Sequence, residues 1–343
     1  MKAIVMTTTG GPDVLHWQEI PAPILTQATH VKVKLQAAGL NPIDTKLRQR
    51  GTFYPEQMPA ILGCDGAGIV TEVGAEVTHL QPGDEVFFCA GGLGERHTGN
   101  YAEYAVVDAS LVVPKPPSLS FIEAAAAPLV LITAWEALYD RGRLEAGQTV
   151  LIHAGAGGVG HVAIQLAKRR GARVLTTVGT PDKARLVRQL GADEPILYRQ
   201  VNLRDTVLSL TQGQGVDLAL DTVGGLTFFE TIPLVKVYGD LVTILEPNYE
   251  LGTLKEARSR NLRLGFTLML TPALLGLPVA LAQQRQILEH CADWLEQGQL
   301  SIHVGQTFPL AEAAAAHRAL EAGHSTGKIV LEIPGESVSS SSS

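Results

Sequence analysis

A glycine-rich turn between an apolar strand and an amphipathic helix is the feature that most constrains this chain. The segment 149–173 reads TVLIHAGAGGVGHVAIQLAKRRGAR. Its apolar start predicts a strand over 149–153, and the spacing of apolar residues after the turn predicts a helix over 158–170. Three glycines at GxGxxG spacing lie between them, namely Gly155, Gly157 and Gly160. This succession is typical of a parallel α/β sheet that binds a dinucleotide.

Each of the three glycines has an expected role in holding a pyrophosphate. Gly155 is expected to permit the tight turn, and Gly157 lacks the Cβ that would keep a pyrophosphate away from the backbone. Gly160 would let the helix pack close to its strand. The phosphates would lie at the helix N-terminus, where unpaired N–H groups and the helix dipole favour an anion. Such a turn can also serve packing alone, but the intact strand and helix favour dinucleotide binding.

The rest of the chain predicts two domains. Residues 2–113 read as short strands between Gly/Pro turns, which predicts an all-β domain. PKPP at 114–117 marks a linker, and residues 121–140 have a helical period. Strands and helices then alternate, and such repeated βα units predict a parallel sheet with helices on both faces. After the glycine turn we expect strands over 173–178, 195–198, 216–221, 240–245 and 262–268, with helices over 181–190 and 203–211.

The last part of the chain is expected to return to the first domain. We expect helices over 278–297 and 310–322. A closing strand is expected over 328–333, and it could complete the sheet of that domain. The run 262–281 is apolar, but Arg263, Gly265 and Pro272 interrupt it. We therefore expect a buried strand and a loop there rather than a membrane span. The serine-rich residues 336–343 have nothing to bury and are expected to be disordered.

Composition and charge favour a protein that binds a small molecule. The chain has 343 residues, of which 45% are hydrophobic and 18% charged, a balance that fills compact cores. A formal net charge of −7 with scattered basic residues argues against nucleic acid as the main partner. The three cysteines form no CxxC pair, and the N-terminus lacks the apolar core of a signal peptide, so we expect a cytoplasmic protein.

The end of the second predicted strand favours NADPH over NADH. An NAD-binding fold places Asp or Glu about 20 residues past the glycine turn, against the ribose hydroxyls. This strand instead ends at Val178-Gly179-Thr180, where Gly179 leaves room and Thr180 offers a hydroxyl. Lys183 and Arg185 follow on the next helix, and a lysine there would pair with a 2′-phosphate that a carboxylate would repel. The alternative is that both are only a solvated helix face.

These motifs, with the β domain before them, resemble the medium-chain dehydrogenase/reductase superfamily, and within it the zinc-free quinone oxidoreductases. The resemblance runs from residue 2 to 333. Its carriers include AAGLNPIDTKLR, ILGCDGAGIVTEVG, GNYAEYAVVD, the glycine turn, VGTPDK, ILYR and GKIVLEI. It implies an α/β protein with a GroES-like catalytic β domain over 1–123 and 271–335. A Rossmann domain, a doubly wound parallel sheet, would cover 124–270, with the active site in the cleft between the two.

The resemblance also bears on zinc. Zinc-dependent relatives have Cys where this chain has Asn41, GHE where it has GCD at 63–65, and Cys near Leu129. Only the thiol and the carboxylate of the GCD motif could ligate, so no tetrahedral site is complete. The cysteine-rich lobe of those relatives is matched here by a stretch with Cys89 alone. Without a Lewis acid, alcohol oxidation is disfavoured, whereas hydride addition to a quinone or an activated alkene needs less help.

By the same resemblance, the cofactor would contact residues at the ends of successive strands. From the pyrophosphate and adenosine phosphate to the nicotinamide, these are Ala156, Gly157, Gly158, Val159, Gly179, Lys183, Tyr198, Gly224, Leu245 and Thr267. Asn41 would face the nicotinamide. Thr133 would do likewise, or its hydroxyl would bond within its own helix.

Two candidate proton donors follow from the resemblance. Many quinone reductases of this type carry Tyr two residues after the aspartate of the NPxD motif, where this chain has Lys46. Lys46 could donate to a developing enolate or hydroquinone oxygen, or point to solvent. A second family tyrosine is matched after a one-residue shift by Phe53 or Tyr54, of which Tyr54 could donate. Asp44 is expected to fix its loop through backbone hydrogen bonds, and His97 could line the cleft.

We therefore predict an NADPH-dependent, zinc-independent reductase that transfers hydride to a quinone or an α,β-unsaturated carbonyl. The residues do not separate these two acceptors. The alternatives are an NADPH-binding structural or regulatory protein with little catalysis, and a zinc-dependent alcohol dehydrogenase. A homodimer is implied by the resemblance, through edge strands such as 262–270, whose apolar face would otherwise be exposed.

Overall fold

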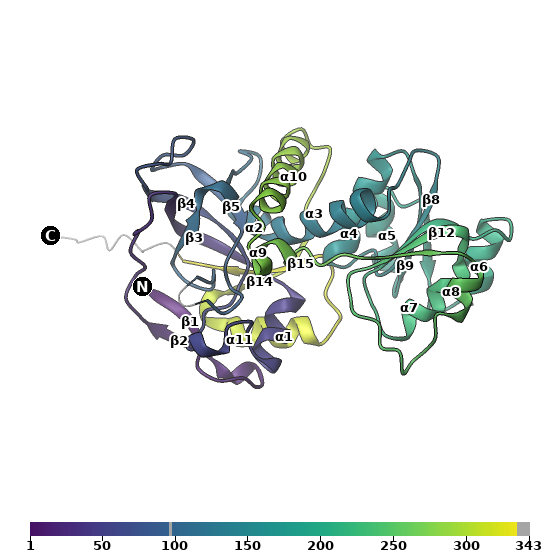
Figure 1. Ribbon diagram of the computed structural model, residues 1–343, viewed down its shortest axis with the longest axis horizontal. Helices are drawn as coiled ribbons and strands as arrows, with labels where there is room; N and C mark the ends of the chain where they lie inside the picture. Colours follow the sequence, from purple (N-terminus) through teal and green to yellow (C-terminus); the bar gives the residue numbers. More distant parts are fainter. Residues whose placement is uncertain (96–97, 335–343) are drawn as a thin grey trace. The chain divides into compact units, whose positions relative to one another are not determined.

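The chain folds into two compact units. The computed structural model describes residues 1–95 and 98–334 (Figure 1). Met1–Leu129 and the described residues from Pro278 onward form the first unit, and Val130–Leu277 forms the second. The sequence predicts that His97 could line the cleft and that the tail 336–343 is disordered. Both lie outside the described residues. No helix in the described residues is long and apolar enough to cross a membrane.

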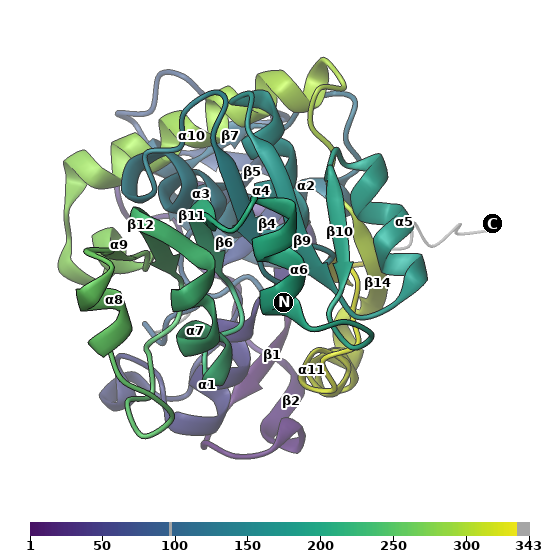
Figure 2. The same cartoon turned by 90° about the vertical axis from the view of Figure 1, so that its right-hand side faces the viewer.

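The second unit is built on a parallel sheet, which has six strands within residues 130–277 of the described chain. They are β8 (Thr149–Ile152), β9 (Arg173–Val178), β10 (Glu194–Leu197), β11 (Val216–Asp221), β12 (Val235–Thr243) and β13 (Arg263–Phe266). Their order is β10-β9-β8-β11-β12-β13, and each neighbouring pair is parallel. Figure 2 labels β9, β10, β11 and β12 of this sheet. The order runs outward from β8 and from β11, so the predicted doubly wound sheet is confirmed.

Helices connect these strands. They are α3 (Pro128–Trp135), which starts at the end of the first unit, α4 (Gly158–Arg169), α5 (Pro181–Gln189), α6 (Leu203–Leu210), α7 (Leu226–Thr231), α8 (Lys255–Ser259) and α9 (Thr271–Leu275). Helices α4, α5 and α6 lie close to the predicted positions, whereas α7, α8 and α9 were not predicted. Side chains of Thr180 and Asn202 accept backbone N–H groups in the first turns of α5 and α6. Strand residues such as Leu151 pack with Val207 of α6 and Phe228 of α7 in a buried core.

The first unit is built on a mainly antiparallel sheet of seven strands in the described residues. They are β3 (His30–Leu40), β4 (Asp65–Val73), β5 (Glu85–Cys89), β6 (Tyr104–Asp108), β7 (Val113–Pro114), β14 (Val304–Pro309) and β15 (Lys328–Glu332). The predicted closing strand is confirmed, because β15 pairs antiparallel with β3, with Ile329 opposite Leu40. The N-terminal strands β1 (Lys2–Met6) and β2 (Leu15–Glu19) form a separate two-stranded sheet.

Helices also occur in the first unit. They are α1 (Pro42–Arg50), α2 (Phe121–Ala126), α10 (Pro278–Glu296) and α11 (Ala313–Glu321). Because α1 lies within residues 2–113, the prediction that this segment is all β is wrong. The NPID motif begins α1 instead of forming a turn, because Asn41 occupies the N-cap and Pro42 the first helical position. The Asp44 carboxylate accepts the Asn41 N–H at 2.8 Å, which ties the first turn together.

Two apolar segments also differ from expectation. The helical run 121–140 is divided, because Pro128 has no N–H to continue α2 and instead begins α3, which a π-helical turn over Glu136–Arg141 follows. The strand in 262–281 is not buried, since β13 lies at the sheet edge with exposed ends. The expected loop after it contains α9, where Pro272 stands in the first turn and needs no N–H partner.

Candidate functional site

The β8–α4 turn leaves space beside one of its glycines. A Cβ on Gly155 would overlap the Thr176 hydroxyl of β9, and one on Gly160 would overlap the Ala154 carbonyl. A Cβ on Gly157 would meet only the Ala154 carbonyl oxygen, at 3.1 Å. The left-handed residue of the turn is Ala154, with φ +49°, so Gly155 is needed for lack of space and not for its backbone conformation. Gly155 and Gly160 permit close packing, and Gly157 has the Ala154 carbonyl as its one close neighbour among the described residues.

The first turn of α4 offers free hydrogen-bond donors. In residues 1–95 and 98–334, the backbone N–H groups of Ala156, Gly158 and Val159 donate to no acceptor outside the helix, and N–H groups in a first turn have none within it. The helix is 12 residues long and has no acidic residue in its first turn. Unpaired N–H groups at a helix N-terminus favour an anion, so the predicted pyrophosphate residues lie where such a group could bind.

A buried hydrogen-bond chain through His153 holds the glycine turn. The Thr177 hydroxyl of β9 accepts the Ala154 N–H at 3.0 Å and lies 3.3 Å from His153 Nδ1. His153 Nε2 lies 2.8 Å from the Thr231 hydroxyl, which itself donates to the Thr227 carbonyl. The imidazole therefore carries its proton on Nε2 and accepts at Nδ1. Burial lowers the pKa of His153 to about 4, so the ring is neutral at physiological pH.

The predicted adenosine phosphate residues gather at the ends of β9 and β10. The two strands are parallel neighbours, so their C-terminal ends lie at the same edge of the sheet. Gly179 and Thr180, which follow β9, therefore lie near Tyr198, which follows β10. A Cβ on Gly179 would lie 3.7 Å from the Tyr198 ring and 3.7 Å from the Arg199 guanidinium. Lys183 follows on α5, where its N–H donates to Thr180 Oγ1 at 3.3 Å. No carboxylate belongs to either strand end.

Arg199 is the residue of this cluster that sequence reasoning missed. Its guanidinium lies 5.7 Å from the centroid of the Tyr198 ring, on the exposed end of β10. Its position in the sequence could have identified it, because Arg199 directly follows Tyr198 at the end of the predicted strand 195–198. Arg185, in contrast, pairs with Asp182 on the exposed face of α5, as the alternative of a solvated helix face implies for that residue.

The predicted ribose and nicotinamide residues follow the ends of β11, β12 and β13. Gly224 and Leu245 lie in contact, because a Cβ on Gly224 would meet the Leu245 Cδ1 at 2.8 Å. Thr267 is buried, and its hydroxyl has no hydrogen-bond partner among the residues that the structure describes. A buried hydroxyl without a partner is a candidate ligand contact. Thr133 is buried on α3 in the same unit.

Asn41 lies in the first unit, in a buried cluster of charged groups. Its side-chain Nδ2 donates to Asp65 Oδ2 at 2.8 Å, and its Oδ1 accepts from the Lys328 ammonium. Lys328 also donates to the Leu40 carbonyl at 2.9 Å. The amide of Asn41 is therefore held on both sides.

Asp44 anchors the start of α1, which confirms the expected role in fixing its loop. The Asn41 N–H and the Tyr101 hydroxyl both donate to Asp44 Oδ2, each at 2.8 Å. Burial raises the pKa of Asp44 to about 7, although these two hydrogen bonds oppose the shift. The Tyr101 ring in turn meets the His317 ring edge-on, with centroids 5.9 Å apart.

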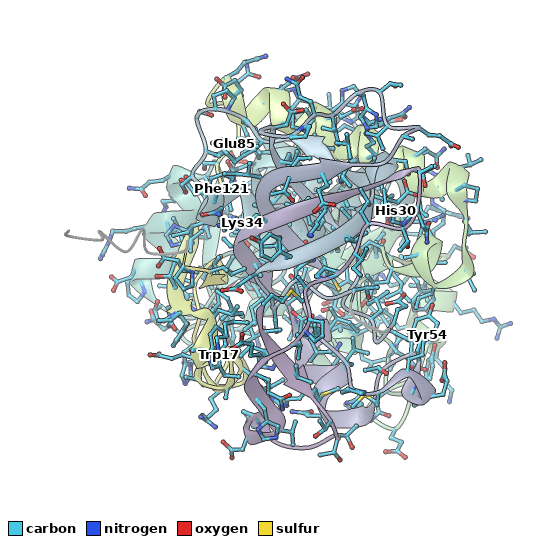
Figure 3. The ribbon with its side chains drawn as sticks, turned by 90° about the vertical axis from the view of Figure 1, so that its left-hand side faces the viewer. Trp17, His30, Lys34, Tyr54, Glu85 and Phe121 are labelled. Atoms are coloured by element: carbon cyan, nitrogen blue, oxygen red, sulfur yellow. The ribbon has the colours of Figure 1, made fainter. Side chains whose placement is uncertain are left out.

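The two candidate proton donors lie in different surroundings of the first unit. Lys46 is half-buried on α1, and burial, with the nearby Arg50, lowers the pKa of its ammonium. It forms no salt bridge to a described residue. Tyr54 lies near the surface, before a 3₁₀ turn at Pro55–Gln57 (Figure 3). Partial burial and two nearby glutamates raise the pKa of its hydroxyl. Their catalytic roles stay predictions.

Metal-ligating side chains do not converge in the described residues, where no group of three or more His, Cys, Asp or Glu could hold a metal ion. Cys64 and Cys89 are free thiols. Burial raises the pKa of both well above the usual range, which opposes formation of the thiolate that metal binding requires.

A β-rich unit joined to a doubly wound sheet with an anion-binding turn defines the class of two-domain dehydrogenases and reductases. The family described as alcohol dehydrogenase GroES-like domain matches residues 27–117, and zinc-binding dehydrogenase matches residues 190–331. The chain is 37% identical over 339 residues to a quinone oxidoreductase of Pseudomonas aeruginosa, covering 96% of this chain and 99% of the relative. The chain belongs to the quinone oxidoreductases of the medium-chain dehydrogenase/reductase superfamily.

Solved structures agree with this family. The Escherichia coli quinone oxidoreductase complexed with NADPH has a TM-score of 0.85 and 29% identity, covering 97% of this chain and 100% of that one. An NAD-dependent alcohol dehydrogenase has a TM-score of 0.87 and 34% identity, with the same coverage. The predicted family, the fold class and the assignment to the oxidoreductases are thus confirmed. Because both structures share the fold, the fold alone does not choose between NAD and NADP cofactors.

The neutral, buried His153 predicts an acid-sensitive second unit. An unfolded chain protonates this histidine near its usual pKa of 6.5, whereas the folded chain does so only near 4. Between these values the unfolded state binds more protons, so stability falls as pH falls, by about 3 kcal/mol at most. We expect His153→Gln to lose less stability than the wild type between pH 7.5 and 4.5 in urea unfolding.

The control for this measurement is His16→Gln, which changes an exposed histidine on β2 and should keep the wild-type pH dependence. Some acid sensitivity should remain in His153→Gln, because burial also lowers the pKa of His317 to about 3. Equal pH dependence in the wild type and His153→Gln would show that His153 is not buried neutral.

Proposed function

We propose that the protein is an NADPH-dependent, zinc-independent reductase that transfers hydride to a quinone or an α,β-unsaturated carbonyl. The observation that carries the cofactor part is the group of Gly179, Tyr198 and Arg199, with Lys183 on the adjoining helix. A guanidinium and an ammonium beside a strand end without a carboxylate suit a 2′-phosphate. The NADPH complex of the related E. coli enzyme supports the same choice.

The residues present fit a dinucleotide along the ends of the parallel strands. The free N–H groups of Ala156, Gly158 and Val159 would hold the pyrophosphate, with Gly157 leaving space for it. Gly224 and Leu245 would flank the ribose, and the Thr267 hydroxyl would bond a polar group at the nicotinamide end. When bound, NADPH supplies the hydride, and the chain supplies position and hydrogen bonds.

We assign the cofactor domain to residues 124–270 and the catalytic domain to residues 1–123 and 271–335. The compact units, which divide at Leu129 and at Leu277, support this assignment. A cytoplasmic location is part of the same proposal, and it is supported by three cysteines that are all free thiols.

Zinc independence is supported by the donor groups of the first unit. The position where zinc-dependent relatives supply a cysteine is occupied by the Asn41 amide, which already bonds Asp65 and Lys328. A divalent ion near Asp65 would meet the Lys328 ammonium, which repels it. Hydride transfer to a quinone or an enone needs no Lewis acid, because conjugation already makes the acceptor electrophilic.

Lys46 is the proposed proton donor to the acceptor oxygen, with Tyr54 as the second candidate. The lowered pKa of Lys46 brings its ammonium closer to the acidity that general-acid catalysis near neutral pH requires. Its half-buried side chain also lacks a competing carboxylate partner among the described residues.

The activity is tested by following NADPH consumption with a panel of acceptors. We expect turnover of 9,10-phenanthrenequinone, 1,4-naphthoquinone or a 2-alkenal, unchanged after dialysis against a chelator. Lys46→Met should lower kcat on the order of 100-fold while NADPH binding is kept. Turnover of enals alone would reject the quinone substrate. NADPH binding without any turnover would favour a structural or regulatory protein, and loss of activity with zinc removal would favour an alcohol dehydrogenase.

The cofactor choice is tested by fluorescence titration with NADPH and NADH. Lys183→Ala and Arg199→Ala should each weaken NADPH binding about 10- to 100-fold, because a hydrogen bond between charged groups contributes about 1.5–3 kcal/mol. NADH binding should change little. Arg185→Ala is the matched control, since this arginine pairs with Asp182, and it should keep the preference for NADPH. Equal losses for both nucleotides would contradict the 2′-phosphate assignment.

We also propose a homodimer formed through β13. In the described residues this strand pairs only with β12, so one edge of the sheet is open. Phe266 and Leu268 are 54% and 56% exposed there, and an apolar open edge favours pairing with a second copy. Light scattering should give twice the mass of one chain, and Phe266→Asp should give a monomer. A wild-type monomer would reject the proposal.

A further inference from the structure

The Lys328 ammonium is buried at the start of β15, where three acceptors surround it. The side chain is only 3% exposed. It donates to the Leu40 carbonyl at 2.9 Å and to the Asn41 Oδ1, and it lies 3.5 Å from Asp65 Oδ2. An ammonium has three protons, so these three acceptors satisfy it completely. Lys328 is therefore a fixed internal cation.

Asp65 is the counter-charge, and it is fixed as firmly. Its Oδ2 accepts from Asn41 Nδ2 at 2.8 Å and its Oδ1 accepts from the Leu129 backbone N–H at 2.9 Å. Burial raises the pKa of Asp65, whereas Lys328, Asn41 and Leu129 act to lower it. An ion pair with all its hydrogen bonds made defines one arrangement of the groups around it.

This arrangement allows the Asn41 amide only one orientation. Its oxygen faces the ammonium and its nitrogen faces the carboxylate. A flipped amide would place its N–H groups against the ammonium and its oxygen against the carboxylate, so both contacts would become repulsive. The amide nitrogen has two protons and Asp65 takes one, so the second Nδ2–H has no assigned acceptor in residues 1–95 and 98–334. A ligand that accepts a hydrogen bond can therefore take this remaining proton.

We propose that Lys328 is a positioning residue that, together with Asp65, presents the Asn41 amide as a hydrogen-bond donor to a carbonyl oxygen of the acceptor. The proposal rests on the reductase function proposed above. Hydride addition places two electrons in the conjugated acceptor and negative charge on its carbonyl oxygen, which then takes up a proton. A hydrogen-bond donor held toward that oxygen stabilises the transition state more than the bound ground state, because the negative charge develops during hydride transfer. Its loss should therefore lower kcat more than it raises the KM for the acceptor.

The kinetic test is a double-mutant cycle with Lys328→Met and Asn41→Ala. We expect Lys328→Met to lower kcat about 10- to 100-fold with little change in the KM for NADPH. In the Asn41→Ala background, Lys328→Met should cause no further loss of kcat, because both changes remove the same hydrogen bond. An unchanged kcat in Lys328→Met, or losses that multiply in the double variant, would overturn the proposal.

Two further variants separate positioning from folding. Lys328→Met leaves the Asp65 carboxylate buried without its cation, so Asp65→Asn/Lys328→Met removes both charges and should restore stability but not kcat. Lys115→Met is the matched control, since Lys115 is also a buried lysine, paired with Glu85 at 3.0 Å in the same unit. It should lose stability and keep kcat. Recovery of kcat in the charge-free variant would mean that Lys328 only stabilises the fold.

A spectroscopic measurement decides the inference even when no acceptor is turned over. The chain has five asparagines, so selective ¹⁵N labelling and the Asn41→Ala variant identify the side-chain amide signals of Asn41. We expect one pair of signals in the wild type, with one slowly exchanging proton, and loss or doubling of that pair in Lys328→Met. Wild-type protein without turnover would reject the proposed function alone, whereas an unchanged Asn41 signal in Lys328→Met would reject the role of Lys328.

Discussion

The close approach of α4 to the ends of β8 and β9 is the constraint on which the nucleotide unit depends. Gly155 and Gly160 leave no space for a Cβ against Thr176 and the Ala154 carbonyl, so the helix begins directly at the sheet. This places the free N–H groups of the first turn at the switch point between β8 and β11. The neutral His153 connects the turn to β9 and to α7, so the position of the anion-binding groups is set by the buried core.

The proposed preference for NADPH rests on side chains that parallel strand pairing brings together. An alcohol dehydrogenase described as NAD-dependent and a quinone oxidoreductase with bound NADPH share this fold at similar TM-scores. The difference between such cofactors is one phosphate, which is recognised by local charge. Here β9 ends without a carboxylate, and its neighbour β10 ends with Tyr198 and Arg199. The register of two adjacent strands thus decides which charges lie beside Gly179, where we propose that the adenosine phosphate binds.

Charge is used differently in the first unit, where the Lys328–Asp65 pair is buried. Burying two charges has a large desolvation cost, and such pairs often contribute little net stability. Their benefit is a defined geometry, because the pair orients the Asn41 amide and holds the first turn of α3 through the Leu129 N–H. Lys328 reaches this position because β15, from the end of the chain, pairs with β3. The buried pair therefore depends on the pairing of the C-terminal strand β15 with β3.

Reading the sequence alone was sufficient for the parallel sheet, the closing strand and the limits of α4, α5 and α6, because these follow from local periodicity and glycine spacing. The family was found from the resemblance of several motifs along the chain. Sequence reading was insufficient for α1, because the NPID motif at the start of this helix also fits a turn. It was also insufficient for the break at Pro128, because the alanine-rich residues around this proline have a helical period. Only the tertiary structure decided that Arg199 lies beside Gly179 and that Lys328 holds Asn41. Such contacts join residues far apart in the chain, and strand register and burial determine them.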